Sequence, residues 1–403
     1  MIRLLLLFVI LVVFGRIGFA AESRREDTAN PVVPGNNAFA FDLYARLRQD
    51  QADNIFFSPH SISTALAMTV AGARGETEAE MLKVLHHDQP RDELHRAFGT
   101  LVKGLKARGN GSGYRLSIAD RLWGQRGYGF LPEYLALTRD HYNAELAQVD
   151  FRQHPQETRQ TINDWVSQQT EGKIKDLLPS ELSTNTCLVL TDAIYFKANW
   201  ADQFDKAATH DAPFYVEGRK NILVPMMHRS GQYRLSASDG IKVLELNYEA
   251  GEMSMIILLP NDVGGLPTLE AKLTSANLTR WLSGLKPRRV SVAIPRFKSS
   301  NQVDLVAPLN ALGITKAFMP EQADFSGING RRDLFIGAAL HQAFVDVHEE
   351  GTEAAAATAI AAGVRSAVTP PLIFRADHPF LFLIRDNASG SILFLGRMMN
   401  PRS

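Results

Sequence analysis

A run of nine residues from Leu188 to Phe196 is almost continuously apolar, and it constrains the fold more than any other segment. A strand of this composition is buried on both faces, so we expect it to be the central strand of a large sheet. Other apolar runs of strand length lie in the second half of the chain. They cover residues 241–248, 253–260, 290–297, 339–347, 380–384 and 392–395. The first two flank residues 249–252, whose composition indicates a hairpin.

The first half of the chain has mainly helical patterns. We expect helices over residues 36–47, 61–73, 78–85, 92–107, 132–142 and 156–173. Ser58-Pro59 begins the second of these helices, since serine can cap a helix and proline fits its first turn. That helix is apolar nearly all round and is therefore expected to be buried. Because no Pro- or Gly-rich linker separates the two halves, we predict one α+β domain with a large sheet.

The charge balance and the lengths of the apolar runs argue against nucleic acid and membranes as partners. Lys plus Arg total 43 and Asp plus Glu total 43, which gives a formal net charge of +0. Nucleic-acid binding needs clustered basic residues, so no nucleic-acid partner is expected. After the N-terminus no segment approaches ~18 uninterrupted apolar residues, so no membrane span is expected. The single cysteine, Cys187, cannot form an intrachain disulfide.

The N-terminus has the pattern of a secretory signal peptide. Arg3 precedes an apolar run over residues 4–14, and Gly18-Phe19-Ala20 supplies small residues near a cleavage site. The apolar run is too short to span a bilayer. A buried N-terminal core segment is the alternative. We expect residues 1–20 to be removed and residues 21–403 to form a single domain, secreted into the extracellular space.

The chain lacks the common motifs for catalysis and metal binding. It contains no G-x-S-x-G, H-E-x-x-H or C-x-x-C. Lys103, Lys106 and Arg108 form a basic patch on one predicted helix. A heparin-like polyanion could bind there, but three charges are more often a solvated face, which is the interpretation we adopt. We therefore expect no enzyme activity, no cofactor and no metal.

Residues 351–368 do not fit a packed domain. From Ala354 to Val364 no side chain is charged, and most are small. An alanine run favours a helix by propensity, but this helix would have no amphipathic stripe to bury. As a strand, alternate residues from Thr352 onward would place small, uncharged side chains on one face. Such a strand could enter an existing sheet without burying a charge.

An Arg365-Ser366 bond ends this run. Exposed and extended, it would suit a trypsin-like protease, whose specificity pocket carries an Asp that pairs with Arg. A mobile, cleavable loop without further function is the alternative.

Motifs along the chain resemble those of the serpin family. Residues 349–359, which read Glu-Glu-Gly-Thr-Glu-Ala-Ala-Ala-Ala-Thr-Ala, look like the hinge of an inhibitory serpin. Residues 54–62 are similar to the start of the family's central buried helix, residues 192–200 to its central strand motif, and residues 377–401 to its C-terminal hairpin. The resemblance covers nearly the whole chain after the leader.

The resemblance implies a metastable serpin fold with about nine helices, three β-sheets and an exposed reactive loop at about 350–370. A target protease would attack this loop and form an acyl-enzyme. The freed hinge would then insert into the large sheet and trap the protease. These features imply a suicide-type inhibitor, with trypsin-like serine proteases as partners, no cofactor and a monomeric state.

The resemblance also implies a cleavage position. In inhibitory serpins the hinge Glu lies seventeen positions before cleavage, counting both ends. From Glu349 this count ends at Arg365, and Ser366 follows, so Arg365–Ser366 is the predicted reactive bond. The predicted hinge consists of Glu349, Glu350, Gly351, Thr352, Glu353, Ala354, Ala355, Ala356, Ala357 and Thr358.

Further residues are implied to control insertion. The predicted sheet-opening cluster consists of Ser58, Ser61, Asp192 and His341. Arg296 would pair with Glu349 near Trp200. Such polar groups can hold two strands together, or each can be an ordinary core polar group. Asn is more typical of the family where this chain has Asp192. An Asp beside His341 favours the imidazolium, so latency or polymerisation rates are predicted to vary with pH.

Two alternatives belong to other functional classes. A non-inhibitory serpin, acting as a carrier or chaperone, would tend to have bulky, charged or proline residues in the hinge, and this hinge has small ones. A secreted hydrolase would need a nucleophile motif, which the chain lacks.

Overall fold

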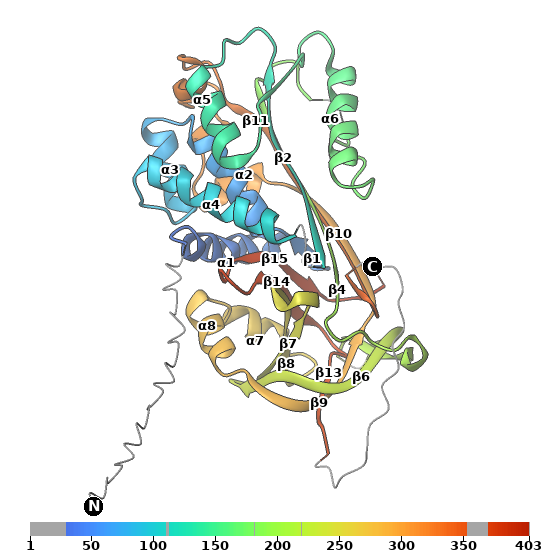
Figure 1. The fold of residues 1–403 in the computed structure, drawn as a ribbon. Coiled ribbons are helices and arrows are strands. Elements are labelled where there is room, and N and C mark those ends of the chain that lie inside the picture. The colour runs from blue at the N-terminus through green and yellow to red at the C-terminus, as the bar shows by residue number, and fades with distance from the viewer. Residues whose placement is uncertain (1–29, 110–112, 181, 219, 353–369, 403) are drawn as a thin grey trace, which may run out of the picture.

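The computed structural model describes residues 30–109, 113–180, 182–218, 220–352 and 370–402. In these residues the strands form two sheets, and helices gather mainly around the longer strands (Figure 1). The predicted reactive bond and hinge residues 353–358 lie outside the described residues, as do residues 1–20.

The run 188–196 lies inside the six-stranded sheet. In spatial order the strands are β10 (Phe297–Asp304), β11 (Ile336–His348), β12 (Gly351–Thr352), β4 (Leu188–Asn199), β2 (Tyr114–Gln125) and β3 (Ala147–Val149). Every residue of β4 from Leu188 to Phe196 is buried, which confirms the predicted central strand. Where β12 does not separate them, β4 and β11 pair directly and in parallel.

The second sheet has nine strands. They are β1 (Ile55–Phe57), β15 (Ile392–Met398), β14 (Phe380–Asp386), β8 (Met253–Pro260), β7 (Ile241–Asn247), β6 (Lys220–Ser238), β9 (Lys286–Pro295) and β13 (Leu372–Arg375), with β5 (His210–Glu217) paired to β6. The resemblance implied three sheets in total. In this structure β6, with 19 residues, hydrogen bonds to β5, β7 and β9 and so joins two groups of strands into one network.

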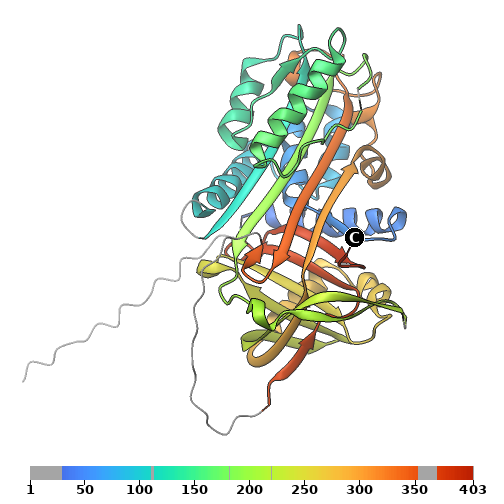
Figure 2. The same ribbon diagram turned by 90° about the vertical axis from the view of Figure 1, so that its right-hand side faces the viewer.

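Ten α-helices lie in the described residues. They are α1 (Val33–Asp50), α2 (Pro59–Val70), α3 (Gly75–Val84), α4 (Arg91–Gly109), α5 (Pro132–Leu137), α6 (Pro155–Gln169), α7 (Leu266–Ala271), α8 (Ser275–Ser283), α9 (Val306–Leu312) and α10 (Ser326–Asn329). All residues of α2 are buried, because this helix packs against β2 and β4 of one sheet and β15 of the other. Figure 2 shows α6 on the opposite face of the six-stranded sheet.

Two predicted elements differ from the structure. The predicted strand 290–297 is divided, because the chain passes from one sheet to the other at Arg296, between the end of β9 and the start of β10. The predicted helix 132–142 changes character part-way: α5 ends at Leu137, and residues Thr138–Tyr142 form a turn of π-helix. The β5–β6 hairpin and helices α7 to α10 were not predicted. The hairpin at 249–252 and the cap at Ser58 are confirmed.

No helix among the described residues is both long and apolar enough to cross a membrane. The same residues contain no group of three or more His, Cys, Asp or Glu side chains arranged to hold a metal ion.

Candidate functional site: the hinge and the seam between β4 and β11

The predicted hinge enters the six-stranded sheet at Gly351 and Thr352, which form β12. After β11 ends, the chain turns back and β12 pairs antiparallel with both β11 and β4: Thr352 lies opposite Val347 on one side and Ala198 on the other. Farther along, β11 and β4 have no strand between them and pair with each other. The line along which they meet is called the seam below. β12 therefore already occupies one end of the seam.

Close packing holds this first part of the hinge in place. A Cβ added at Gly351 would lie 2.1 Å from the carbonyl oxygen of Ala198, so only glycine fits there. The side chain of Thr352 is fully buried, and its hydroxyl lies 2.9 Å from the hydroxyl of Tyr248. A charged side chain at Thr352 would have no access to water.

Two glutamates before β12 are held by a set of residues that we call the hinge clasp. The clasp consists of Trp200, Phe204, Lys206, Thr209 and Arg296. Arg296 Nε donates to the Glu349 carboxylate at 2.6 Å, and the Thr209 hydroxyl donates to the same oxygen. Lys206 pairs with Glu350. The backbone N–H of Phe204 donates to the Glu349 carbonyl at 2.8 Å, and that of Trp200 to the Glu350 carbonyl at 2.9 Å.

The charge of Glu349 is stabilised in spite of its burial. Its side chain is 1% exposed. Burial alone would raise the pKa of Glu349, but hydrogen bonds from Arg296 and Thr209 outweigh it and lower the pKa below the usual value. The predicted pairing of Arg296 with Glu349 is thus present in the structure, and it exists because the chain changes sheets at Arg296.

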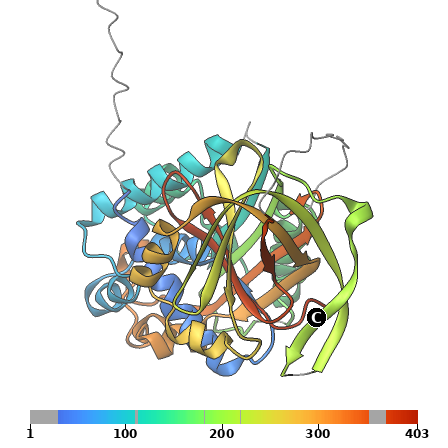
Figure 3. The same cartoon turned by 90° about the horizontal axis from the view of Figure 1, so that it is seen from below.

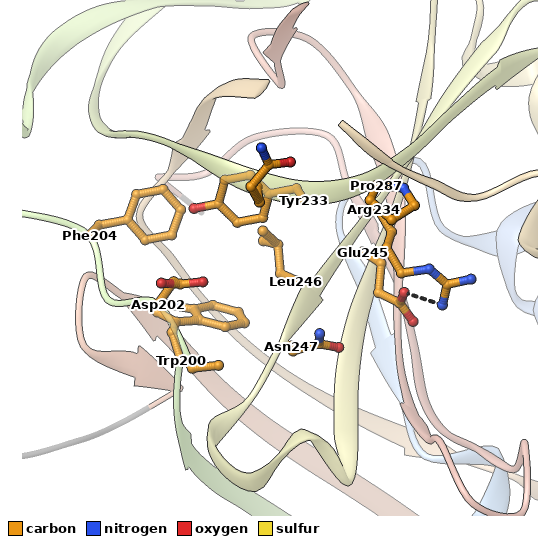
Figure 4. Close-up of a pocket in the computed structure, with 11 residues that line it drawn as sticks. Trp200, Asp202, Phe204, Tyr233, Arg234, Glu245, Leu246, Asn247 and Pro287 are labelled. Carbon is orange, nitrogen blue, oxygen red and sulfur yellow. Dashed lines mark hydrogen bonds and ion pairs between the residues drawn. The ribbon is translucent and has the colours of Figure 1, made fainter. Parts of the chain in front are cut away.

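Trp200 connects the clasp to the larger sheet. Its indole stacks on Tyr248, with ring centroids 4.5 Å apart and planes at 11°, and its Nε1 donates to the His348 carbonyl at 2.9 Å. A cavity of about 120 Å³ lies beside it, with Phe204 and Tyr233 among the lining residues (Figure 4). The stacking fixes the indole where its N–H can hold the end of β11.

The sheet-opening cluster lies under the seam, at the start of α2. The Ser58 hydroxyl donates to the Leu393 carbonyl at 2.6 Å, which ties α2 to the larger sheet. The Ser58 N–H donates to His341 Nε2 at 3.0 Å, and His341 Nδ1 lies 3.2 Å from an oxygen of Asp192. His341 and Asp192 are paired across the seam. The four predicted residues are therefore brought together, and a strand entering the seam would separate two of them.

The hydrogen bond from Ser58 defines the state of the His341 ring. Nε2 accepts a hydrogen bond from the backbone N–H and so carries no proton itself, which places the ring proton on Nδ1, on the side of Asp192. The imidazolium expected from the sequence is wrong for this geometry, because an imidazolium would turn two N–H groups toward each other.

Asp120 is a member of the cluster that the sequence reasoning missed. It lies opposite Asp192 in the β2–β4 ladder. The Ser61 hydroxyl oxygen lies 2.8 Å from an oxygen of Asp120 and 2.6 Å from an oxygen of Asp192, yet it has one proton to donate. Burial and, next, the charge of Asp192 raise the pKa of Asp120 well above its usual range. The two carboxyls therefore share one proton.

The histidines near the cluster do not neutralise this pair. His60, on α2, is fully buried, and burial lowers its pKa to about 4 although Asp192 and Asp386 act in the other direction. His341 is held neutral by Ser58. An isolated Asp in a strand-like segment carries no signal of its own; only the register of β2 against β4 reveals the pair.

Comparison with known proteins identifies the family. Residues 34–401 match the family model described as Serpin (serine protease inhibitor). The chain belongs to the serpin family. Human leukocyte elastase inhibitor is 45% identical over 378 residues, which cover 91% of this chain and 98% of that protein. A serpin-like protein of Thermococcus kodakarensis is 41% identical over 380 residues, which cover 94% of this chain and 88% of that protein.

Solved serpin structures have the same fold. Uncleaved ovalbumin superposes with a TM-score of 0.83 at 34% identity, covering 92% of this chain and 100% of that chain. Human thyroxine-binding globulin in complex with thyroxine superposes with a TM-score of 0.84 at 33% identity, covering 93% of this chain and 99% of that chain. A serpin of the insect Tenebrio molitor superposes with a TM-score of 0.82 at 32% identity, covering 93% of this chain and 99% of that chain. The predicted α+β serpin fold is confirmed.

The shared proton predicts how the stability of this serpin depends on pH. The native state binds the proton more tightly than the unfolded chain does, so the free energy of unfolding should fall as pH rises above about 4 toward the raised pKa of Asp120. Asp192→Asn leaves one carboxyl, and its amide can still accept from the Ser61 hydroxyl and donate to Asp120. We expect a flatter pH profile and a gain on the order of 1 kcal/mol at high pH.

Urea unfolding followed by circular dichroism between about pH 5 and pH 9 measures this profile. Asp120→Asn should flatten it in the same way, whereas substitution of the exposed Asp262 by Asn should leave it as in the wild type. If the Asp192→Asn profile runs parallel to that of the wild type, the two carboxyls do not share a proton.

Proposed function

We propose that this serpin is a suicide-type inhibitor of Arg-specific, trypsin-like serine proteases, cleaved between Arg365 and Ser366. The observation that carries the proposal is the position of β12, which starts the hinge inside the seam between β4 and β11. As a continuation of that strand, the sequence after Thr352 would place small, uncharged side chains on one face. They match what an inserting strand requires.

Insertion would replace one ladder with two. In the native state β4 and β11 pair in parallel along the seam, while β12 is antiparallel to both. A hinge that continued β12 would exchange a parallel ladder for two antiparallel ones, which are slightly more stable per residue and fix twice as many backbone hydrogen bonds. Loop cleavage would release the hinge for this step.

The chemistry belongs to the protease. Its serine would attack the carbonyl carbon of Arg365, the Arg365–Ser366 bond would break, and Ser366 would leave with a free amine, so that residues up to Arg365 remain bound to the protease as an ester. This serpin would supply the cleavable bond and the free energy of insertion, which moves the ester away from water and deforms the protease.

The names of the relatives suggest two alternatives: elastase as the target protease, and a carrier role without inhibition. The human relative is named for leukocyte elastase, and elastase has a small specificity pocket, which would favour cleavage after a small residue such as Val364. A structural relative binds thyroxine, which favours the carrier alternative. Arg365 argues for trypsin-like targets, and the alanine-rich hinge argues for insertion over carriage. The N-terminal pattern over residues 1–20 supports secretion.

Mixing with trypsin tests the proposed function. We expect a covalent complex that survives boiling in SDS, with a new N-terminus at Ser366. Arg365→Ala should slow complex formation with trypsin by roughly 100-fold or more, since it removes the charged group that the protease pocket binds. Elastase run in parallel should react more slowly than trypsin with the wild type. Clipping with fully active trypsin would favour the carrier, and faster reaction with elastase would contradict Arg specificity.

A matched pair of hinge variants tests insertion itself. In a strand continued from the buried Thr352, Ala356 would share the inward face of Thr352 and Ala355 would take the other face. Ala356→Arg would force a charge into the sheet interior and should convert this serpin from inhibitor to substrate. Ala355→Arg should leave it an inhibitor. The number of serpin molecules consumed per trypsin inhibited measures the difference, and equal values for the two variants would rule out the assigned face.

A further inference from the structure

Three cations at the start of β9 lack carboxylate partners among the described residues. Lys286, Arg288 and Arg289, which we call the basic strip, are all exposed, and no described carboxylate forms an ion pair with them. Arg288 donates to the carbonyl of Pro287 alone. The strip therefore has positive charge that no described carboxylate compensates by an ion pair.

The carboxylates of the neighbouring elements already form ion pairs with other arginines. Arg234 lies opposite Pro287 in the β6–β9 ladder, and its guanidinium binds Glu245 at 2.8 Å. On α8, Arg280 binds Asp239 at 2.8 Å. Both acids are balanced by their own arginines, so neither reduces the charge of the basic strip.

The basic strip adjoins an exposed apolar edge. β13 pairs with β9 from Leu372 opposite Val290, directly after Arg289. Leu372 is 50% exposed and Ile373 is 69% exposed. Figure 1 places β13 and β9 at the lower end of the molecule, and Figure 3 views that end directly. Because side chains alternate along a strand, Arg289 shares one face of the sheet with Ile373, and Lys286 and Arg288 share the other face with Leu372. Positive charge and exposed apolar side chains therefore lie together at this edge of the sheet, on both of its faces.

This surface is close to the predicted reactive bond. Leu372 follows Ser366 by six residues, and six residues span at most about 20 Å even when fully extended. A protease domain of about 200 residues has a radius of gyration of about 16 Å, so its full width exceeds that span. A protease centred on Arg365–Ser366 would extend roughly 20 Å to each side, which brings β13 within its reach and the start of β9 beside it.

We propose that the basic strip, with Leu372 and Ile373, is a docking surface for an acidic patch beside the active site of the target protease. The inference rests on the proposed function and adds a property of the partner. Opposite charges would steer the encounter, and the apolar edge would be buried in the contact. A protein partner fits this combination better than a polyanion does, because protein interfaces pair an apolar centre with a polar rim.

Two trypsins of opposite net charge test the proposal, since an anionic and a cationic form share the same Arg specificity. The variant carries Lys286→Glu, Arg288→Glu and Arg289→Glu. At low ionic strength we expect its association rate constant with anionic trypsin to fall about 10-fold or more, and the loss to shrink at high salt. Its rate with cationic trypsin should not fall. The pair Lys103→Glu and Lys106→Glu on α4 is the matched control and should leave both rates unchanged.

Several outcomes would overturn the docking surface. Equal changes with the two trypsins, or no change with either, would show that the strip does not steer the protease. If heparin accelerates wild type but not the variant while both trypsins respond alike, the strip binds polyanions instead. Failure of the proposed function is distinguishable, because wild type would then form no SDS-stable complex with either trypsin. The melting temperatures of all variants confirm that these exposed substitutions preserve the fold.

Discussion

The rest of the structure depends on the parallel contact between β4 and β11. These strands are far apart in sequence, both are central, and along most of their length only hydrogen bonds and side chains hold them together. A sheet whose two central strands are paired in parallel, with an antiparallel strand already started between them, has a second arrangement available with more hydrogen bonds. On the proposed mechanism, the native arrangement would persist because β4 and β11, spaced about 4.8 Å apart, must first separate to admit a further strand.

Two sets of polar groups act on this seam at different points. The hinge clasp holds Glu349 and Glu350 at the end that β12 occupies, through side chains from the loop after β4 and from the crossing at Arg296. The sheet-opening cluster sits beneath the middle of the seam and joins α2 to both sheets through Ser58. Advance of the hinge would have to break the contact between His341 and Asp192. We infer that these buried polar groups specify one arrangement of the strands more than they add to stability.

The sequence was informative wherever a single local residue pattern was enough to predict the element that forms there. The apolar run ending at Phe196 predicted the central strand, Ser58-Pro59 predicted the start of the buried helix, and the alanine-rich hinge led to the family. It was uninformative where the contacts of a residue depend on how one strand is aligned with another. Asp120 becomes meaningful only when β2 is aligned with β4, and the break at Arg296 depends on two sheets meeting there. The state of His341 followed from a backbone N–H that no sequence pattern places.

The central claim is that the intact chain is held above its lowest free energy by the closed seam. The most direct measurement is the thermal unfolding midpoint of the intact protein beside that of protein clipped in the reactive loop and freed of protease. We expect the clipped form to unfold at a higher temperature, by about 10 °C or more, because its hinge completes the sheet. A clipped form that unfolds at the same or a lower temperature would contradict the claim.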